Sequence, residues 1–349
     1  MLSQILEHIE ASGPMPFDVF MEMCLYDENH GFFAAGRGGP GATADFVTAP
    51  EISPLFGTLV GEWAKARIRD DWIVVEIGGG TGALLGPMLG VVGGIDTYVI
   101  ERSRPAREGI IASIPGTKAV RSIGEIAAKG AVVVMNEVLD NIPAAIVRRT
   151  PEGWIEVAVG ADDGSLCLVD LSVRPEVASW ASEHIGSVPV GTVASVQLRA
   201  SDLVAQVFEA FDEVALVVFD YGGVADELAA RPPGEVVRTY RRQRTGFDYL
   251  RHPGETDITV DVNTDAVASV ATTAGADVES QLQSDFLRSL GAQETLDRLK
   301  QQEIACAKAG DVMGQLKARS DGLALRALLD PAGFGGFAVV TAERISRVD

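Results

Sequence analysis

Apolar residues recur at helical spacing near the start of the chain. Over residues 2–9 they fall three or four positions apart, until Gly13-Pro14 interrupts the pattern. A second helix is predicted from about Pro16 to Cys24, and a third over residues 54–67. Between these two helices the segment GRGGPG, residues 36–41, favours a mobile loop. Residues 1–70 are therefore predicted to form an N-terminal helical cap.

From Trp72 onward the pattern changes to short apolar runs that alternate with helical segments. The runs are WIVVEI (72–77), TYVIE (97–101), TKAV (117–120), AVVVMNE (131–137) and VALVVFDYG (214–222). Such alternation is typical of βαβ units and a parallel sheet, which makes this an α/β protein. Residues 146–200 are less regular. Weaker strands are predicted at 276–282 and 334–343, with a helical block, 284–328, between them.

The charge balance bears on possible partners. The chain of 349 residues carries 29 basic and 49 acidic residues, a net charge of −20. Such a surface repels nucleic acid and anionic membranes and favours a basic partner or substrate. The three cysteines do not suggest a disulfide framework, and residues 1–20 show no signal or transit peptide. The apolar stretch 73–95 contains Glu76, Pro87 and eight glycines, so no membrane span is expected. We therefore expect a cytoplasmic protein.

A glycine-rich turn follows the first predicted strand. Its glycines are Gly78, Gly79, Gly80 and Gly82. Glycines there let the backbone approach a ligand closely, and a helix from about Ala83 would direct its N–H groups at that ligand. Glu101 ends the next strand, where a carboxylate can accept hydrogen bonds from both ribose hydroxyls of a nucleoside. A turn that binds nothing is the alternative.

Two cofactors fit this loop, and Glu76 distinguishes them. The spacing Gly78-x-Gly80-x-x-Ala83 also satisfies the dinucleotide pattern, so an NAD-dependent oxidoreductase is a rival interpretation. Glu76, however, lies inside the strand, where a buried charge is costly. A carboxylate there can meet the ammonium group of S-adenosyl-L-methionine, but it would repel a pyrophosphate. The electrostatics favour the methyl donor.

Polar residues also stand at the tip of the fourth strand and in a segment near the N-terminus. Asn136-Glu137 ends the strand and Asp140 follows, at the edge where such sheets bind ligands. A simple helix start, with Asn136 as its cap, is the alternative. The segment 44–53 carries Phe46 and Glu51. From periodicity alone it is a connector that ends in a helix cap at Ser53.

Several motifs in this order resemble the MidA-like methyltransferase family, which includes a mitochondrial respiratory complex I assembly factor that methylates an arginine. The matching pieces are LYDENHGFF (25–33), ADFVTAPEISPLFG (44–57), VVEIGGGTGALL (74–85), NEVLDNIP (136–143), FDYGG (219–223), HPGETDITVDVN (252–263) and SDFLRSLG (284–291). They extend over about 270 residues. A match spread this widely is more specific than any single glycine loop.

The resemblance implies a Rossmann-like class I methyltransferase fold with a seven-stranded, mostly parallel sheet that ends in an antiparallel hairpin. The expected segments are an N-terminal helical cap (1–70), a cofactor-binding core (71–222), an acceptor-side insertion (223–330) and a C-terminal strand (331–349). Whether the chain forms oligomers stays open.

The resemblance also implies roles for individual residues. Glu76, Gly78 and Gly80 would line the methionine end of the cofactor and Glu101 would hold its ribose. Asn136-Glu137 would border the methyl-transfer site, and the segment Asp45–Glu51, with Thr48 and Pro50, would close over the cofactor. Two positions depart from the family: Gln243 and Asp261 stand where histidines are usual. Both lie in the acceptor-side insertion, so the methyl acceptor can differ.

Methyl transfer from a sulfonium needs neither a protein nucleophile nor a metal, and the sequence shows no spacing typical of either. If the acceptor is a protein arginine, its guanidinium needs carboxylates to orient it. Our hypothesis is an acidic clamp of Glu137 with Glu51 or Asp140. The alternatives are a small-molecule or peptide methyltransferase, and a non-catalytic assembly factor that binds S-adenosyl-L-methionine.

Overall fold

The computed structural model describes residues 1–33, 47–241, 244–246 and 248–346. The chain forms two compact units. Unit 1 comprises residues 1–46, 137–206 and 220–274, and unit 2 comprises residues 47–136, 207–219 and 275–349. These units interleave along the sequence, so they differ from the four consecutive segments expected above, and that four-part division stays a prediction. Among the described residues, no helix is both long and apolar enough to cross a membrane.

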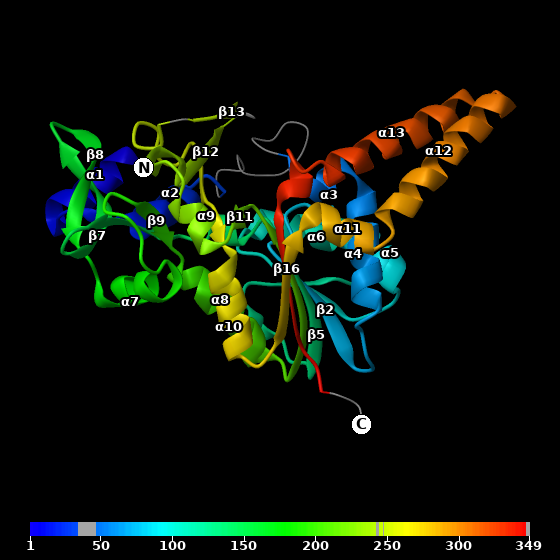
Figure 1. Cartoon of the computed structure of the whole chain (residues 1–349), viewed down its shortest axis with the longest axis horizontal. Coiled ribbons are helices and arrows are strands. Elements are labelled where there is room, and N and C mark those ends of the chain that lie inside the picture. Colours follow the sequence, from blue (N-terminus) through cyan, green and yellow to red (C-terminus); the bar gives the residue numbers. More distant parts are fainter. Residues whose placement is uncertain (34–46, 242–243, 247, 347–349) are drawn as a thin grey trace. The chain divides into compact units, whose positions relative to one another are not determined.

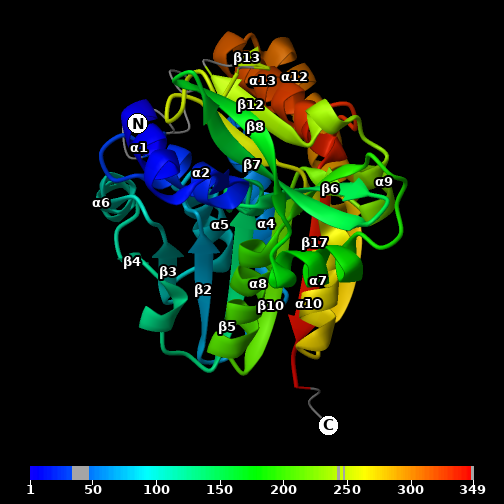
Figure 2. The same cartoon turned by 90° about the vertical axis from the view of Figure 1, so that its left-hand side faces the viewer.

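Unit 2 is built on a seven-stranded sheet. Its strands are β2 (Trp72–Ile77), β3 (Thr97–Ile100), β4 (Lys118–Val120), β5 (Gly130–Asn136), β10 (Glu213–Asp220, whose last residue is counted with unit 1), β16 (Asp277–Leu282) and β17 (Ala338–Arg344). The order across the sheet is β16-β17-β10-β5-β2-β3-β4, and Figure 2 shows β3, β2, β5 and β10 side by side. The neighbours from β10 to β4 pair in parallel, whereas β16 and β17 pair antiparallel. This confirms the predicted Rossmann-like sheet.

Unit 2 also contains helices, several of which cover its sheet. They are α3 (Ala49–Ile52), α4 (Pro54–Lys65), α5 (Leu85–Val92), α6 (Arg104–Ser113), α11 (Gln283–Ser289), α12 (Ala292–Ala309) and α13 (Val312–Leu329), with short 3-10 turns η1 (Ile123–Glu125) and η4 (Phe334–Gly336). Figure 1 shows α4, α5 and α11 together on one face of the sheet. Strands β2, β5 and β10 are buried almost throughout, which explains why their sequences are continuous apolar runs.

Helices α4 and α5 pack closely because α4 presents glycines to α5. A Cβ added at Gly57 would lie 2.5 Å from the carbonyl oxygen of Leu84. One added at Gly61 would lie 2.9 Å from the carbonyl oxygen of Met88. Both obstacles are backbone atoms, which cannot rotate away as a side chain can. The interface therefore depends on glycine at these two positions.

We expect Gly57→Ala to lower the free energy of unfolding by about 1–3 kcal/mol, because the added methyl group overpacks this interface. Gly90→Ala is the matched control: it lies within α5, and its added Cβ would have nothing within 4 Å. There alanine should stabilise the helix by about 0.5–1 kcal/mol. Chemical denaturation of both variants tests this, and equal effects would contradict it.

Unit 1 contains an antiparallel sheet that the sequence reasoning missed. Its strands are β1 (Met15–Pro16), β6 (Ala145–Thr150), β7 (Gly153–Asp162), β8 (Ser165–Ser172) and β9 (Val193–Val196), in the order β1-β7-β6-β9 with β8 also on β7. A signal was present in the sequence, since Asp163-Gly164 connects β7 to β8 and both residues have positive φ. Asp-Gly between alternating strands is typical of a tight hairpin turn. The region 146–200 is therefore regular.

Unit 1 also contains elements outside this sheet. They are α1 (Leu2–Ser12), α2 (Phe17–Tyr26), η2 (Leu139–Asn141), α7 (Pro175–His184), β11 (Gly222–Gly223), α9 (Ala225–Ala229), η3 (Pro233–Glu235), β12 (Val237–Arg241), β13 (Arg244–Thr245), β14 (Asp257–Val260), β15 (Val262–Asn263) and α10 (Thr264–Thr273). Helix α8 (Leu198–Ala210) continues from unit 1 into unit 2. Helices α1 and α2 pack with Ile146, Ile258 and Val260 in one apolar core. The predicted loop at 36–41 lies outside the described residues.

Candidate functional site

The glycine loop of unit 2 turns sharply directly after β2. Gly78, Gly80 and Gly82 have φ of 73°, 50° and 77°, a region that favours glycine. The Gly78 N–H donates to the carbonyl oxygen of Ile100 at 2.9 Å, which joins the loop to the end of β3. A Cβ added at Gly79 would lie 2.5 Å from a methyl carbon of Val99. The loop therefore needs glycine for its own geometry.

Glu76 is a buried carboxylate beneath this loop. Its side chain is 4% exposed, and within the described residues its Oε2 atom accepts no hydrogen bond. Burial, and secondarily the negative charge of Glu101, raises the pKa of Glu76 to about 8. A buried acid without a partner is costly unless a cation meets it. These features fit the ammonium group of S-adenosyl-L-methionine and do not fit a pyrophosphate.

Glu101 stands where β3 ends, on the same edge of the sheet as the glycine loop. Its Oε1 atom accepts the N–H of Ser103 at 2.8 Å, and Arg107 donates to its backbone carbonyl at 2.6 Å. Ser103 in turn caps α6 by accepting the N–H of Ala106. The turn therefore holds the half-buried carboxylate at the strand tip. Its contact with a ribose stays a prediction.

Thr48, Pro50 and Glu51 form the start of the short helix α3. Thr48 and Glu51 make a reciprocal capping box, in which the Thr48 N–H donates to Glu51 Oε2 at 3.3 Å. Pro50 lies in the first turn, and Ser53 caps α4 by accepting the N–H of Leu55, as the connector interpretation expected. Glu51 therefore has a structural role of its own. The closure of this segment over a cofactor stays a prediction, and Asp45 and Phe46 lie outside the described residues.

The chain turns sharply at Glu137, the residue after β5. Asn136 ends β5 beside Phe219 of β10, and Glu137 has a φ of 52°, which is rare for a residue with a side chain. The next helical segment, η2, has Val138 as its N-cap, so Asn136 does not cap a helix there. Backbone strain of this kind is found preferentially at functional sites.

Asp220 stabilises this turn within unit 1, a role that the sequence reasoning missed. Its side chain is 2% exposed, and its Oδ2 atom accepts the N–H groups of Val138, Leu139 and Asp140 at 3.2, 2.9 and 3.3 Å. The motif FDYGG is part of the family resemblance, but the resemblance implies no role for its aspartate. The signal was its position: it ends the strand next to β5, and adjacent parallel strands end at the same edge.

Further acidic groups gather around the same turn. Asp140 accepts a hydrogen bond from the hydroxyl of Tyr221, and its other oxygen, Oδ1, has no hydrogen-bond partner among the described residues. Burial raises the pKa of Asp140 to about 6, although the Tyr221 hydrogen bond opposes the rise. Burial, then the charges of Asp140 and Glu137, raises the pKa of Asp220 well above its usual value. Unit 1 thus holds a cluster of carboxylates, Glu137, Asp140 and Asp220, that we call the acidic cluster.

We expect Asp220→Ala to lower the free energy of unfolding by about 2–5 kcal/mol, because three N–H groups lose their common acceptor. Asp248→Ala is the control. Asp248 also accepts two backbone N–H groups, those of Leu250 and Arg251, but it is exposed, so its loss should cost less than about 1 kcal/mol. Denaturant titration of both variants measures the difference, and similar losses would show that Asp220 does not hold the turn.

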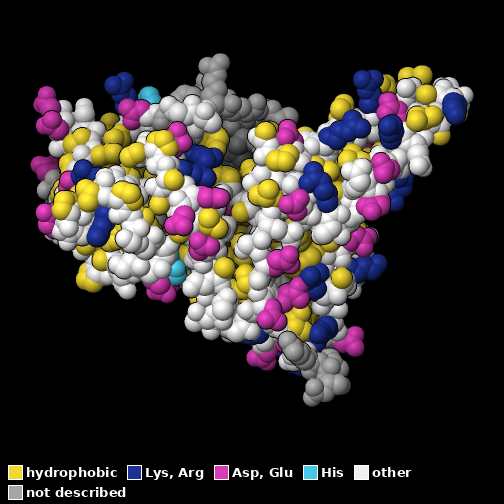
Figure 3. Space-filling view, viewed as in Figure 1, with side chains coloured by type: hydrophobic (Ala, Val, Ile, Leu, Met, Phe, Trp, Pro, Cys, Tyr) yellow, Lys and Arg dark blue, Asp and Glu magenta, His cyan; other side chains and the backbone are white. Residues whose placement is uncertain are grey.

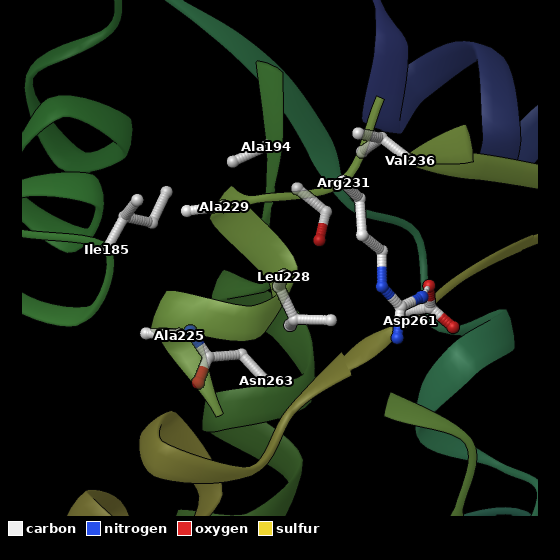
Figure 4. A pocket seen from close by; sticks show the side chains of 10 residues that line it. Ile185, Ala194, Ala225, Leu228, Ala229, Arg231, Val236, Asp261 and Asn263 are labelled. Atoms are coloured by element: carbon white, nitrogen blue, oxygen red, sulfur yellow. Dashed lines mark ion pairs between the residues drawn. The ribbon is translucent and has the colours of Figure 1, made fainter. Parts of the chain in front are cut away.

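Asp261 is one of the two departures from the family pattern. Its carboxylate is buried and forms ion pairs with two arginines. It forms ion pairs with Arg231 and with Arg238, the latter at 3.1 Å. Figure 4 shows Arg231 and Asp261 pointing toward each other at one end of a cleft whose other walls include Leu228 and Val236. The guanidinium of Arg238 also lies 5.5 Å from the ring centre of Tyr221. Asp261 thereby connects to the acidic cluster through Arg238. Gln243 lies outside the described residues.

Of the predicted site residues, unit 2 contains the glycine loop, Glu76, Glu101, Asn136 and the capping box of Thr48 and Glu51. Unit 1 contains Glu137 and Asp140. Glu137 and Asp140 have a common neighbour, Asp220, on whose pKa both charges act, and their pairing as an acceptor clamp stays a prediction. The pairing of Glu137 with Glu51 stays a prediction.

Comparisons with known proteins indicate the family and its cofactor. Residues 57–281 match the family model described as "Putative S-adenosyl-L-methionine-dependent methyltransferase". The chain is 23% identical to the mitochondrial protein arginine methyltransferase NDUFAF7 of Xenopus tropicalis, over 88% of this chain and 80% of that protein. It is 27% identical to the Drosophila melanogaster homologue, over 78% of this chain and 70% of that protein. A Burkholderia thailandensis protein crystallised with S-adenosyl-homocysteine aligns at a TM-score of 0.79 and 26% identity, over 98% of this chain and 91% of that one.

Proposed function

We propose that this chain, which belongs to the S-adenosyl-L-methionine-dependent methyltransferase family, methylates an arginine side chain of a basic protein. The general activity follows from the family: the chain is a methyltransferase and S-adenosyl-L-methionine is its methyl donor. The NAD-dependent interpretation is therefore wrong, although the glycine pattern alone allowed it. The acceptor is the part that we propose.

The donor fits unit 2 through Glu76. When bound, it supplies a methyl group already activated on a sulfonium. We expect Glu76 to meet its ammonium group, with Gly78, Gly79, Gly80 and Gly82 close to its methionine part. Glu101 would hold the ribose hydroxyls, and Asn136, Thr48 and Pro50 would complete the contacts.

The acidic cluster carries the proposal that the acceptor is an arginine. Burial raises the pKa of Asp140, and burial together with the charges of Asp140 and Glu137 raises the pKa of Asp220, so the cluster strongly favours a cation. A guanidinium is a planar cation that carboxylates bind with two parallel hydrogen bonds. The names of the curated relatives give the same acceptor class. The net charge of −20 further favours a basic protein over an acidic one.

In this proposal the chain's residues orient the acceptor and receive its proton. Glu137, with Asp140 or Glu51, holds the guanidinium so that one nitrogen keeps its lone pair for the transfer. Asp220 keeps Glu137 in its strained turn through the three N–H groups described above. The proton released from the nitrogen passes to a carboxylate of the cluster or to water. Positioning of the two reactants can contribute roughly 7–11 kcal/mol to lowering the barrier.

Labelled methyl transfer to a cell lysate tests the acceptor. We expect the label in the protein fraction, and after acid hydrolysis in methylarginine. Label in the small-molecule fraction would instead support a small-molecule methyltransferase, the alternative that the altered position Asp261 favours. Label that never leaves the cofactor would support a non-catalytic assembly factor. A cytoplasmic location stays a prediction, because the curated relatives are named as mitochondrial.

A further inference from the structure

Helices α12 and α13 form a long antiparallel hairpin that extends away from the sheet of unit 2 (Figure 1). The base of this hairpin is packed, since Leu325, Leu328 and Leu329 belong to the core of the unit. Farther out, between residues 296 and 317, all of which the structure describes, no residue is buried. Two isolated helices that bury so little are marginal in water, because helices in proteins derive most of their stability from tertiary packing. The outer hairpin therefore has little besides the contact between its own two helices to stabilise it.

Large apolar side chains are concentrated on this outer part. Of the twelve that are exposed in the described part of the chain, five lie between residues 304 and 323: Ile304, Val312, Met313, Leu316 and Leu323. Met313 is 75% exposed. Figure 3 shows hydrophobic side chains together with Lys and Arg at the tip of the hairpin. Single exposed apolar residues need no explanation, but a contiguous group is typical of a protein interface.

The charge of the hairpin differs from that of the rest of the chain. Residues 292–329 carry six basic and five acidic residues, whereas the whole chain carries 29 and 49. Two copies of so acidic a protein repel each other over most of their surface, and they repel least where these hairpins meet. The groove between the helices is lined by both signs of charge, among them Glu303 and Arg319, beside Leu299 and Leu323. A surface with both signs can complement itself across a two-fold axis.

We propose that the outer α12–α13 hairpin is a dimerisation surface, and that its partner is the same hairpin of a second copy of this chain. Two such hairpins would form a four-helix bundle, in which Val312, Met313 and Leu316 become buried. The proposal is independent of the methyl acceptor. It concerns a surface of unit 2 built from residues outside the glycine loop.

Sedimentation equilibrium of the full chain, from about 1 to 100 μM, tests the proposal. We expect the wild type to be a dimer, and Met313→Glu combined with Leu316→Glu to raise the dissociation constant at least about 100-fold. Glutamate is a good helix former, so the variant should keep the hairpin itself. Leu168→Glu, at an apolar side chain 48% exposed on β8, is the matched control and should leave the dimer intact.

Binding of S-adenosyl-homocysteine, measured on each variant, shows whether unit 2 is still folded. Hydrogen exchange adds a second measurement: amides of residues 300–320 should gain protection as the protein concentration rises. Three outcomes would overturn the proposal. These are a wild type that stays monomeric at 100 μM, a dimer that survives the double substitution, and a dimer that Leu168→Glu disrupts equally.

Discussion

Glu76→Gln should weaken the binding of S-adenosyl-homocysteine by about 10- to 100-fold at pH 8 and should stabilise the cofactor-free protein. The loss of affinity arises because the neutral amide replaces the carboxylate that meets the ligand's ammonium group, and a hydrogen bond to a charged group contributes about 1.5–3 kcal/mol. Isothermal titration calorimetry measures the affinity. The expected gain in stability follows from the pKa of Glu76, which is about 8 in the folded protein against an ordinary value of 4.5.

The sign of the stability change follows from proton binding. Between pH 4.5 and 8 the folded protein keeps the Glu76 proton that the unfolded chain has released, so this residue makes the protein less stable as the pH rises through that range. At pH 7 Glu76 lowers the free energy of unfolding by about 3 kcal/mol relative to a residue that does not titrate. The figure comes from 1.36 kcal/mol for each pH unit above the ordinary pKa of 4.5. Glutamine does not titrate. The variant should therefore unfold at a higher denaturant concentration, and the difference should vanish near pH 4.

The same pKa predicts the pH dependence of cofactor binding. Below pH 8 the wild type must release the Glu76 proton before its carboxylate can meet an ammonium group, so the affinity should fall by up to about tenfold per pH unit on acidification. The Glu76→Gln variant shows how much of this change arises from titration of the ligand itself. Glu108→Gln, at an exposed glutamate of α6, is a control that should change neither property. A parallel pH dependence in the wild type and in Glu76→Gln would remove Glu76 from the cofactor site.

Glu137→Gln should lower methyl transfer by about 10²–10⁴-fold while leaving the affinity for S-adenosyl-homocysteine within about twofold of the wild type. The glutamine keeps the size of the side chain but removes the charge that would orient a guanidinium. Asp140→Asn should act in the same direction. Glu152→Gln, at an exposed position before β7, should have no effect. Single-turnover measurements of label transfer separate the loss in the chemical step from a loss in binding.

Two outcomes would decide against the acidic cluster. If Glu137→Gln transfers methyl groups at the rate of the wild type, Glu137 has no part in the reaction. If it loses cofactor binding in proportion to turnover, then the residue supports the donor and not the acceptor. The Asp220→Ala variant helps in the interpretation, because it disturbs the Glu137 turn without removing the Glu137 carboxylate.

Local patterns in the sequence were sufficient to predict most of unit 2. Strands β2, β5 and β10 are buried on both faces, so each is a continuous apolar run that is recognisable without its neighbours. The glycine loop and Glu76 were also recognisable, because left-handed backbone and a charge inside a strand are properties of single residues. Most strand ends shifted by one or two residues, as expected where hydrogen bonding fades gradually, but the last strand begins at Ala338, four residues later than predicted, because residues 334–336 form the turn η4.

Only the tertiary structure decided how distant segments combine. The β1-β7-β6-β9 sheet of unit 1 pairs strands whose alternating pattern is weak, and whether such a strand forms depends on partners elsewhere in the chain. Asp220 holds the Glu137 turn although about eighty residues separate them. Hydrogen bonds of this kind are directional and leave no periodic trace in the sequence. The sequence by itself therefore determined which methyl donor is bound and the sheet that binds it. The environment of each carboxylate was determined only by the fold.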